Sequence, residues 1–375
     1  MRCVVFATGG TGGHIFPALA VAEEVRRRYP DADLLFFGGK QGPEGRLARA
    51  AGLEFHALPA KGVLGRGLRS AASLVWLSRS LTACWWQFHK RRPDVVLGLG
   101  GYAGFVPPLA ATLSRIPCAI HEQNSIPGVT NRILGKRVDR VFVSFADEHG
   151  FFPNNKVVFT GNPVRREILA LRASQSERLP RDTEHRVLIL GGSQGAKGIN
   201  AAVIQALPSF ARSQMQLWHQ TGAREFADIQ AAYTEAGLGE RACVEPFIED
   251  MAKAYEWADL VVCRAGATTI AELTAVGKPS VLIPFPHATH NHQQRNAASL
   301  EAAGAAMVLG QHYLQEVNLA RAIGDLVDLP GKLKEMGRAA KQIGRPEAAA
   351  KVVDQLEELA NTRRKKKTFK YSRST

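Results

Sequence analysis

The sequence of 375 residues lacks the features of membrane-spanning and disulfide-bonded proteins. No uncharged apolar run reaches the roughly 18 residues that a spanning helix needs, and the longest candidate, residues 102–113, contains two prolines. Only about six apolar residues precede the first glycines, which is too few for a secretory signal. The five cysteines form no C-x-x-C pair, so we expect small buried side chains rather than a disulfide framework. These absences predict a globular protein of the cytoplasm.

The positive charge of the chain, a net +14, is concentrated near the C-terminus. Seven Lys and Arg residues and no acid lie in residues 362–375, so this stretch supplies half of the net charge. Such a composition predicts a disordered basic tail. The remaining positive charge favours anionic partners, which include nucleotides, nucleic acid and lipid surfaces.

Two glycine-rich loops occur, GGTGGH at residues 9–14 and GGSQGA at residues 191–196. Each follows a short apolar run and precedes a helical pattern. This order leaves backbone N–H groups unpaired at the helix start, beside the positive end of the helix dipole, and such a corner attracts phosphate. Neither loop fits the G-x-G-x-x-G fingerprint or the GxxxxGK(S/T) pattern. A plain tight turn is the alternative for each loop taken alone.

Short apolar runs alternate with helical patterns in both halves of the chain. The runs lie at residues 3–7, 34–37, 95–97, 118–120 and 141–143 in the first half and at 187–190, 215–218, 260–263 and 281–284 in the second. The alternation predicts an α/β fold with two Rossmann-like domains, each built on a parallel sheet. A Gly-Asn-Pro turn at residues 161–163 marks the boundary. We therefore expect domains at 1–163 and 164–344, and a helix near 345–361 that packs back on the first domain.

Polar residues follow the apolar runs, at the edge where open parallel sheets bind ligands. His14 comes directly after the glycines of the first loop, at the predicted helix start. Histidine titrates near neutral pH, which suits a general base. The alternative is a hydrogen-bonding residue that only fixes the loop.

Glu272 lies in the first turns of a helix, predicted over 267–275, that opens directly after a glycine turn. Its carboxylate could accept hydrogen bonds from a ribose while the backbone N–H groups of Ala267 and Thr268 face a diphosphate. An acid that only stabilises the helix is the alternative. Arg165 follows the boundary turn, where it either offsets phosphate charge or is an ordinary surface arginine.

Three histidines, His287, His290 and His292, stand close together in the sequence. No carboxylate or cysteine accompanies them. The sequence therefore predicts that they form no metal site.

Together the motifs resemble the GT-B glycosyltransferases, and among them the UDP-N-acetylglucosamine transferases of peptidoglycan synthesis. The matching stretches are GGTGGHIFPALA at 9–20, DVVLGLGGY at 94–102, HEQN at 121–124, GNPVR at 161–165, GGSQGA at 191–196, WHQTG at 218–222, CRAGATTIAEL at 263–273 and FPHATHNHQQRNA at 285–297. A loop at residues 61–67 fits only loosely, and the basic tail lies outside the resemblance.

The resemblance implies a GT-B architecture of two domains facing a central cleft. It also implies an inverting transfer of N-acetylglucosamine from UDP to the 4-hydroxyl of the muramyl sugar of lipid I, without metal or cofactor. The implied substrate contacts are Thr11, Gly12, Gly13, Asn124, Arg165, Ser193, Ile248, Ala267, Thr268, Thr269, Ile270, Ala271, Glu272 and Gln293. In that scheme Glu272 holds the ribose hydroxyls and the backbone of Ile248 meets the uracil. His14 takes the proton of the acceptor hydroxyl.

A polyprenyl acceptor implies a surface that faces a membrane. Apolar residues recur at helical spacing before a basic run at 89–92: Leu74, Leu77, Leu81, Trp85 and Phe88, with Trp76 and Trp86 as added aromatic bulk. Such a helix can rest on anionic headgroups, to which the basic tail adds attraction, whereas a helix packed on the sheet is the alternative. We expect a peripheral protein at the cytoplasmic face of the bacterial plasma membrane, with other cell-wall enzymes as further candidate partners.

Two other functions compete with this one. A nucleic-acid-binding protein would use the basic charge, yet that charge lies in the tail while the predicted ligand loops hold glycine and small polar residues. We therefore expect no nucleic acid partner. A sugar-nucleotide epimerase of the same two-domain architecture would release a rearranged UDP-sugar without an acceptor, and this alternative stays open.

Overall fold

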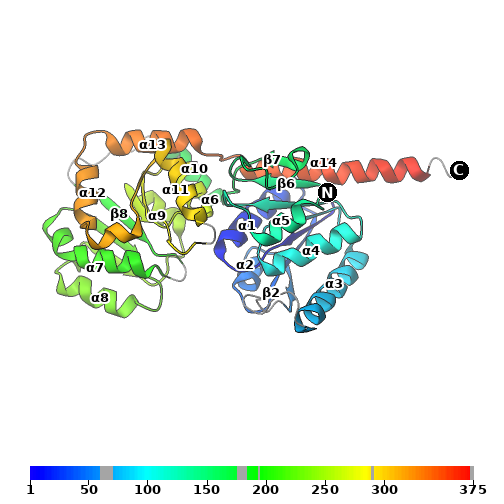
Figure 1. Ribbon diagram of the computed structural model, residues 1–375, viewed down its shortest axis with the longest axis horizontal. Coiled ribbons are helices and arrows are strands. Elements are labelled where there is room, and N and C mark those ends of the chain that lie inside the picture. The colour runs from blue at the N-terminus through cyan, green and yellow to red at the C-terminus, as the bar shows by residue number, and fades with distance from the viewer. Residues whose placement is uncertain (60–70, 175–183, 193–194, 289–290, 372–375) are drawn as a thin grey trace. The chain divides into compact units, whose positions relative to one another are not determined.

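The computed structural model describes residues 1–59, 71–174, 184–192, 195–288 and 291–371 (Figure 1). The chain divides into two compact units. Unit 1 comprises Met1–Arg165 and Pro346–Thr375, and unit 2 comprises Arg166–Arg345. The unit boundary thus falls close to the Gly-Asn-Pro turn, and each unit is an α/β structure on a parallel sheet, which confirms the predicted fold class.

The sheet of unit 1 is parallel throughout, with strand order β3-β2-β1-β4-β5-β6-β7. The strands are β1 Cys3–Ala7, β2 Asp33–Gly39, β3 Glu54–Leu58, β4 Val95–Gly98, β5 Cys118–Glu122, β6 Arg140–Val143 and β7 Val157–Phe159. The central strands β1, β4 and β5 are buried along their whole length. The strands β1 and β4 and the first three residues of β5 are apolar because helices cover both faces of the sheet, whereas β5 ends with the buried polar residues His121 and Glu122.

Two helical layers sandwich this sheet. The helices of unit 1 are α1 Gly12–Arg28, α2 Glu44–Ala50, α3 Ala71–Arg91, α4 Tyr102–Leu113, α5 Val129–Gly135 and α14 Ala348–Tyr371. Successive side chains of a strand point to opposite faces, so Val4 and Phe6 pack with α1, α2 and α14. Val5 and Ala7 pack with α3, α4 and α5 on the other face.

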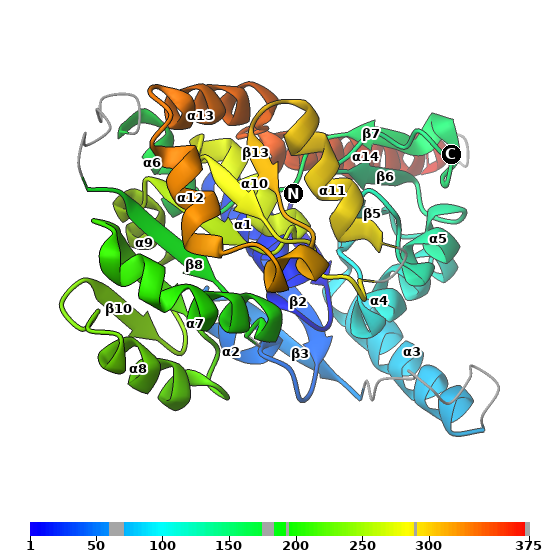
Figure 2. The ribbon, with the colours of Figure 1, turned by 60° about the vertical axis from the view of Figure 1, so that its left-hand side comes forward.

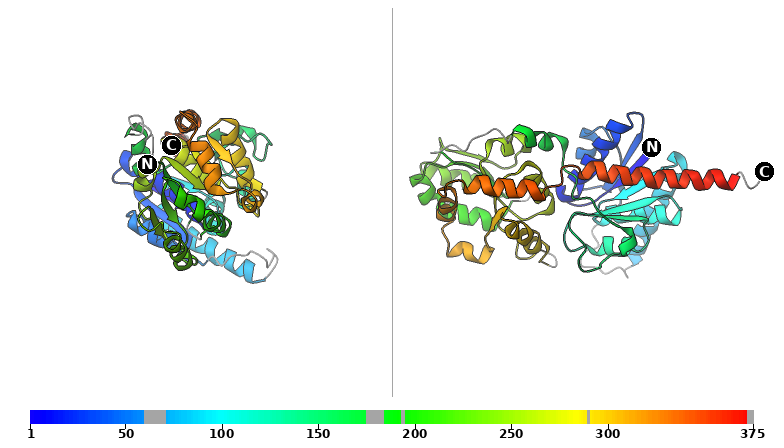
Figure 3. Two further views of the ribbon diagram at one scale, coloured as in Figure 1. Left: turned by 90° about the vertical axis from the view of Figure 1, so that its left-hand side faces the viewer. Right: turned by 90° about the horizontal axis from the view of Figure 1, so that it is seen from above.

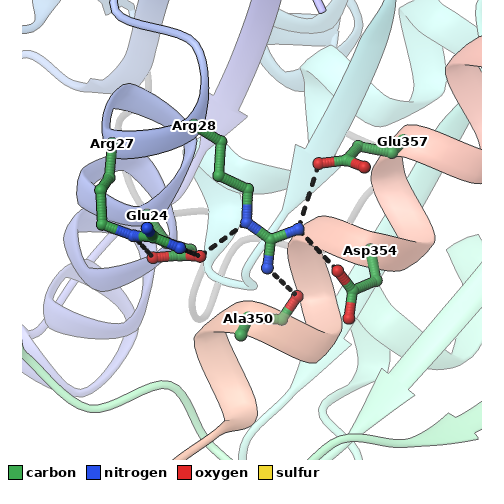
Figure 4. A network of polar contacts seen from close by, with 6 residues as sticks. All are labelled: Glu24, Arg27, Arg28, Ala350, Asp354 and Glu357. Atoms are coloured by element: carbon green, nitrogen blue, oxygen red, sulfur yellow. Dashed lines mark hydrogen bonds and ion pairs between the residues drawn. The ribbon is translucent and has the colours of Figure 1, made fainter.

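The helix α14 returns to unit 1 after the chain has built unit 2, and it lies along α1 (Figure 3). The guanidinium of Arg28 joins the two helices: its Nη1 lies 2.6 Å from Asp354 Oδ1 and 3.1 Å from Glu357 Oε1 (Figure 4). Its Nη2 donates to the carbonyl of Ala350 at 3.3 Å, and its Nε donates to Glu24 at 2.6 Å. These contacts hold α14 in register on α1.

Residues 362–371 were expected to be disordered, but the helix α14 continues through them to Tyr371. No glycine or proline interrupts the sequence from residue 347 to 371. Lys and Arg are also good helix formers, so composition alone overstated the disorder of this basic segment.

Unit 2 repeats the strand order of unit 1, as β10-β9-β8-β11-β12-β13, again all parallel. The strands are β8 Arg186–Leu190, β9 Gln216–Gln220, β10 Ala242–Glu245, β11 Leu260–Cys263, β12 Ser280–Leu282 and β13 Ala306–Val308. The helices are α6 Arg166–Ser174, α7 Lys197–Arg212, α8 Phe226–Glu235, α9 Met251–Trp257, α10 Ala267–Val276, α11 His292–Ala302, α12 Leu319–Val327 and α13 Lys332–Ile343. The helix α7 packs beside α8 and α12 on one face of the sheet (Figure 2).

Across the described ranges of both units, none of the helices combines the length and the apolar character needed to cross a bilayer.

Candidate active site

The first glycine loop interlocks with a second pair of glycines in unit 1. Gly9 N–H donates to the carbonyl of Gly100 at 3.1 Å. Gly101 has a φ of +76°, and a Cβ there would lie 2.0 Å from the carbonyl oxygen of Gly9. Only glycine fits such an approach. The chain turns after β1 and β4 are therefore fixed against each other at the carboxyl edge of the sheet.

A cavity of about 350 Å³ opens at this edge. It is lined by Gly9, Gly10, Thr11, His14, Gly39, Gln41, Gly42, Glu44, Gly101, Tyr102 and Ala103. The buried carboxylate of Glu44 accepts the N–H of Gly10 at 2.8 Å through Oε1. The loop was expected to offer free N–H groups to phosphate, but a carboxylate already takes this one.

His14 lies on the wall of that cavity and is tied to the loop after β5. Its Nδ1 lies 3.0 Å from Oε1 of Gln123. The Nε2 of Gln123 donates to the carbonyl of Leu99 at 3.0 Å and lies 3.2 Å from Nδ1 of His121. His121 in turn places its Nε2 3.0 Å from the carbonyl of Gly161. Three segments that are distant from His14 and from one another in the sequence, at residues 99, 121–123 and 161, thus meet behind its imidazole.

Burial lowers the pKa of His121 to about 4, against a weaker opposing effect of its hydrogen bond to Gly161. The nearby His14 lowers this pKa further. His121 is therefore neutral at neutral pH. The motif HEQN was noted in the sequence, but no role was predicted for Gln123 or His121.

Asn124 is held in place by the buried carboxylate of Glu122. Glu122 Oε1 accepts the backbone N–H of Asn124 at 3.0 Å, and Oε2 accepts the N–H of Gly128 at 3.1 Å. The Nδ2 of Asn131 also donates to Oε2, at 2.8 Å. This carboxylate is satisfied from three sides, so it fixes the loop that carries Asn124.

Arg165 lies beside the first glycine loop. Its guanidinium stacks over the ring of Phe16 at 4.3 Å from the ring centroid. A Cβ at Gly12 would come within 2.9 Å of that ring, so glycine at this position leaves room for the stacked pair. The structure thus gathers Thr11, Gly12, His14 and Arg165 at one end of α1.

Glu272 of unit 2 is buried, with 5% of its surface exposed. Its Oε2 accepts the hydroxyl hydrogen of Tyr255 at 2.9 Å. The helix α10 that carries it starts at Ala267 after Gly266. Thr268, Thr269 and Ala271 are partly exposed, whereas the side chain of Ile270 is buried. The backbone N–H of Ile270 donates to the carbonyl of Gly266 at 2.9 Å, so the free N–H groups of this helix start lie before Ile270.

The backbone N–H of Ile248 donates to Oε1 of the buried Gln220 at 3.0 Å. This pairing was not predicted. Because the N–H of Ile248 is occupied, the carbonyl of Ile248 is the backbone group left for the uracil base. Gln293, at the start of α11, accepts the N–H of Phe285 at 2.9 Å. Ser193 lies outside the described residues.

His219 is a second buried imidazole, in β9 of unit 2. Its Nε2 lies 3.2 Å from Oδ1 of Asn200, and the hydroxyl of Tyr233 lies 3.2 Å from its Nδ1. Burial lowers its pKa to about 3. Asn200 also donates to the carbonyl of Thr221 at 3.0 Å. These hydrogen bonds attach the first turn of α7 to β9 and to the residue after it. His290 lies outside the described part of the chain, and the expectation of no metal stays a prediction.

Each of the two units matches the model of a known protein family. The model of the glycosyltransferase family 28 N-terminal domain matches residues 4–143, and that of the family 28 C-terminal domain matches residues 186–355. The chain belongs to glycosyltransferase family 28. The two family 28 domains correspond to unit 1 and unit 2, and the predicted glycosyltransferase class is confirmed.

Along nearly its whole length the protein is similar to transferases that are named for one reaction. It is 50% identical over 362 residues to the UDP-N-acetylglucosamine--N-acetylmuramyl-(pentapeptide) pyrophosphoryl-undecaprenol N-acetylglucosamine transferase of Nitratidesulfovibrio vulgaris, with 96% of this chain and 99% of that protein covered. The protein of the same name from Geobacter sulfurreducens is 44% identical over 364 residues, with 96% and 99% covered.

Solved structures agree with this assignment to family 28. MurG of Acinetobacter baumannii is 31% identical with a TM-score of 0.76, and the match covers 96% of this chain and 100% of that one. UDP-GlcNAc 2-epimerase from Neisseria meningitidis, solved with UDP-GlcNAc, is 15% identical with a TM-score of 0.67 over 96% and 100% of the two chains. The epimerase shares the fold alone, so the epimerase alternative loses its support.

Proposed function

We propose that this protein transfers N-acetylglucosamine from UDP-N-acetylglucosamine to the N-acetylmuramyl-(pentapeptide) pyrophosphoryl-undecaprenol acceptor. The observation that carries the proposal is 50% identity, over nearly the whole of both chains, to a transferase named for that reaction. The acceptor is lipid I and the product lipid II, formed by attack of the 4-hydroxyl of the muramyl sugar with inversion at the anomeric carbon.

In this reaction a residue of unit 1 removes the proton of the acceptor hydroxyl. His14 lies on the wall of a cavity large enough for part of a sugar, among residues with few competing charges. It takes the hydroxyl proton as the new bond forms, as a general base does. Thr11, Gly12, Gly13, Asn124 and Arg165 are the further proposed contacts of unit 1.

Unit 2 binds the nucleotide. The N-terminus of α10 offers backbone N–H groups at residues 267–269 to the diphosphate, and negative charge there increases as UDP leaves. The carboxylate of Glu272, which is oriented by the hydroxyl of Tyr255, accepts hydrogen bonds from the ribose hydroxyls. Ser193, Ile248 and Gln293 complete the proposed donor contacts, together with Ile270 and Ala271, which connect the helix start to Glu272.

The decisive experiment incubates the protein with labelled UDP-N-acetylglucosamine and a short-chain lipid I analogue. We expect label in the lipid product, a requirement for the acceptor, and inversion at the anomeric carbon. A reaction without acceptor tests the epimerase. If a rearranged UDP-sugar forms there and no lipid is labelled, the proposed transfer is wrong.

The acceptor lipid calls for a membrane-facing surface, and α3 supplies one. Leu77, Leu81 and Phe88 pack in the core under the sheet. On the other side of the same helix Trp85 and Trp86 are 58% and 55% exposed. The helix thus packs on the sheet with one face and exposes tryptophans on the other, and the membrane role of the exposed face stays a proposal. The side chain of Leu74 is outside those described.

A cavity of about 560 Å³ lies beside these tryptophans. Its lining includes Trp85 and His89 of α3, Arg92 directly after that helix, Leu113 of α4 and Ala360 of α14. Leu113 is 70% exposed, and the Nζ of Lys90 lies 5.3 Å from the ring centroid of Trp86. Aromatic, aliphatic and basic side chains in one patch suit the headgroup region of an anionic bilayer. We assign this patch to peripheral binding at the cytoplasmic face of the plasma membrane, while an association with other cell-wall enzymes stays a prediction.

A further inference from the structure

The side-chain amide of Gln123 has only one orientation that its surroundings allow. One end faces two backbone carbonyls, those of Leu99 at 3.0 Å and His121 at 3.3 Å. Carbonyl oxygens only accept hydrogen bonds, so the NH2 end must point to them. The other end, Oε1, therefore faces Nδ1 of His14 at 3.0 Å.

His121 supports the same orientation from behind. Its Nε2 faces the carbonyl of Gly161 at 3.0 Å and must carry a hydrogen. In the neutral ring Nδ1 then has the lone pair, and that atom lies 3.2 Å from Nε2 of Gln123. An amide oxygen turned toward this lone pair would be repelled.

The consequence falls on His14. Because Oε1 of Gln123 can only accept, Nδ1 of His14 must carry a hydrogen. Neutral His14 then has its lone pair on Nε2. We infer that Gln123 and His121 are positioning residues that hold His14 as the Nδ1–H tautomer, so that Nε2 is the nitrogen that receives the acceptor proton. This inference rests on the proposed function for the identity of the proton donor, but the tautomer itself does not.

The proposed proton transfer involves only His14, the acceptor hydroxyl and the UDP-sugar. The acceptor hydroxyl gives its hydrogen to Nε2 of His14 while its oxygen bonds to the anomeric carbon. The bond from that carbon to the diphosphate oxygen breaks, and UDP leaves with the electron pair. The imidazolium keeps Nδ1–H on Gln123, so the ring is not reoriented during the step.

The groups around His14 leave its ring little freedom. A Cβ at Gly100 would lie 3.1 Å from the ring carbon Cε1. The titratable groups that face it are His121 behind Gln123 and Glu44 on the same cavity. Because the partner of Nδ1 is a neutral amide, the ring is oriented without an added charge.

The first test is spectroscopic and measures the wild-type protein directly. Long-range proton–nitrogen NMR spectra of protein labelled with ¹⁵N-histidine distinguish the two tautomers, and His14→Gln assigns the signal among the eleven histidines. We expect the unprotonated nitrogen of neutral His14 to be Nε2. If Nε2 carries the hydrogen in the wild-type protein, the inference is wrong, whatever the protein catalyses.

The second test is kinetic. Gln123→Met keeps the size of the side chain but removes the acceptor, and we expect a mixed tautomer and a fall in kcat of about 100-fold, with KM for both substrates within about threefold. Gln123→Glu keeps an acceptor but adds charge, so the acidic limb of the kcat profile should move to higher pH. Gln87→Met is the matched control. The Nε2 of Gln87 lies 3.3 Å from Nδ1 of His56, and neither residue lines the cavity of His14.

The outcomes separate the two claims. Unchanged kcat in Gln123→Met, with His14 still the Nδ1–H tautomer, would overturn the positioning role while the proposed transfer stands. A wild-type protein that shows the expected tautomer but transfers no sugar would overturn the proposed function and leave the tautomer inference intact.

Discussion

Unit 1 and unit 2 are built on the same strand order but carry different chemistry at the carboxyl edge of the sheet. In unit 1 the edge holds two imidazoles joined through a glutamine, and two carboxylates that fix the neighbouring loops. In unit 2 it holds a helix start and one buried carboxylate fixed by a tyrosine. We propose that the first arrangement moves a proton and that the second binds a phosphate and a ribose. A shared scaffold therefore says little about which half performs the chemistry, and the side chains behind the loops decide it.

The largest expected effect is in unit 1. His14→Ala should lower kcat by about 10³-fold, within the range that a general base contributes. The affinity for UDP-N-acetylglucosamine, measured by isothermal titration calorimetry, should stay within about twofold because the donor-binding groups of unit 2 are intact. The opposite pattern, with donor binding lost and turnover of bound donor kept, would reverse the division of labour.

The second effect is in unit 2. Glu272→Ala should weaken UDP-N-acetylglucosamine binding by about 10- to 100-fold, since hydrogen bonds to a charged group contribute about 1.5–3 kcal/mol. Tyr255→Phe is the graded control: it keeps the carboxylate but removes the hydroxyl that orients it, and about a fivefold loss is expected. Calorimetry and the donor KM measure both. If Glu272→Ala lowers kcat at saturating donor and leaves the donor affinity unchanged, the ribose assignment is wrong.

The two units should respond alike to acid. The pKa of His121 is about 4 and that of His219 about 3, whereas each is near 6.5 in the unfolded chain. Between pH 6.5 and the folded pKa the unfolded state binds the extra proton. The contribution of each neutral histidine to the free energy of unfolding is therefore fully present above pH 6.5. It decreases as the pH falls, by up to about 1.4 kcal/mol per pH unit for each histidine.

His219→Gln isolates the contribution of unit 2 to this acid response. Glutamine has a side-chain N–H that can replace Nε2–H toward Asn200, but it does not titrate in this range. Urea unfolding at several pH values should show a shallower loss of stability below pH 6.5 than in the wild type. An unchanged slope would mean that His219 is not neutral in the folded protein.

The smallest expected effect concerns the membrane-facing patch of unit 1. The double variant Trp85→Ser and Trp86→Ser should bind anionic vesicles about tenfold more weakly, because interfacial binding scales with the buried apolar area. Leu329→Ser in unit 2 removes another exposed apolar side chain, 54% exposed, and should have no effect. Transfer to a water-soluble acceptor should be equal in all three proteins. Equal vesicle binding by the double variant would remove α3 from the interface.

The fold could be predicted because its signal is local. Each central strand is an apolar run and each loop after it contains glycine, so the sheets and their ligand edges follow from short stretches of sequence. His14 and Glu272 were found for the same reason. Gln123 was not, because its role depends on Leu99 and Gly161, which reach it only through the order of β4, β5 and the chain after β7. Glu44 was missed too, since nothing near residue 44 shows that it meets Gly10.

The return of α14 to unit 1 sets the order in which a growing chain can finish folding. Val352, Val353 and Leu356 belong to the same buried cluster as Val4, Phe6 and Ile15. Domains generally fold as units during synthesis, with the N-terminal one first. Here the unit that begins first cannot close its core until residues beyond 356 have left the ribosome, after all of unit 2 has emerged. Until then the part of this sheet face and of α1 that α14 covers is exposed, and that nascent chain is where aggregation or chaperone capture is most to be expected.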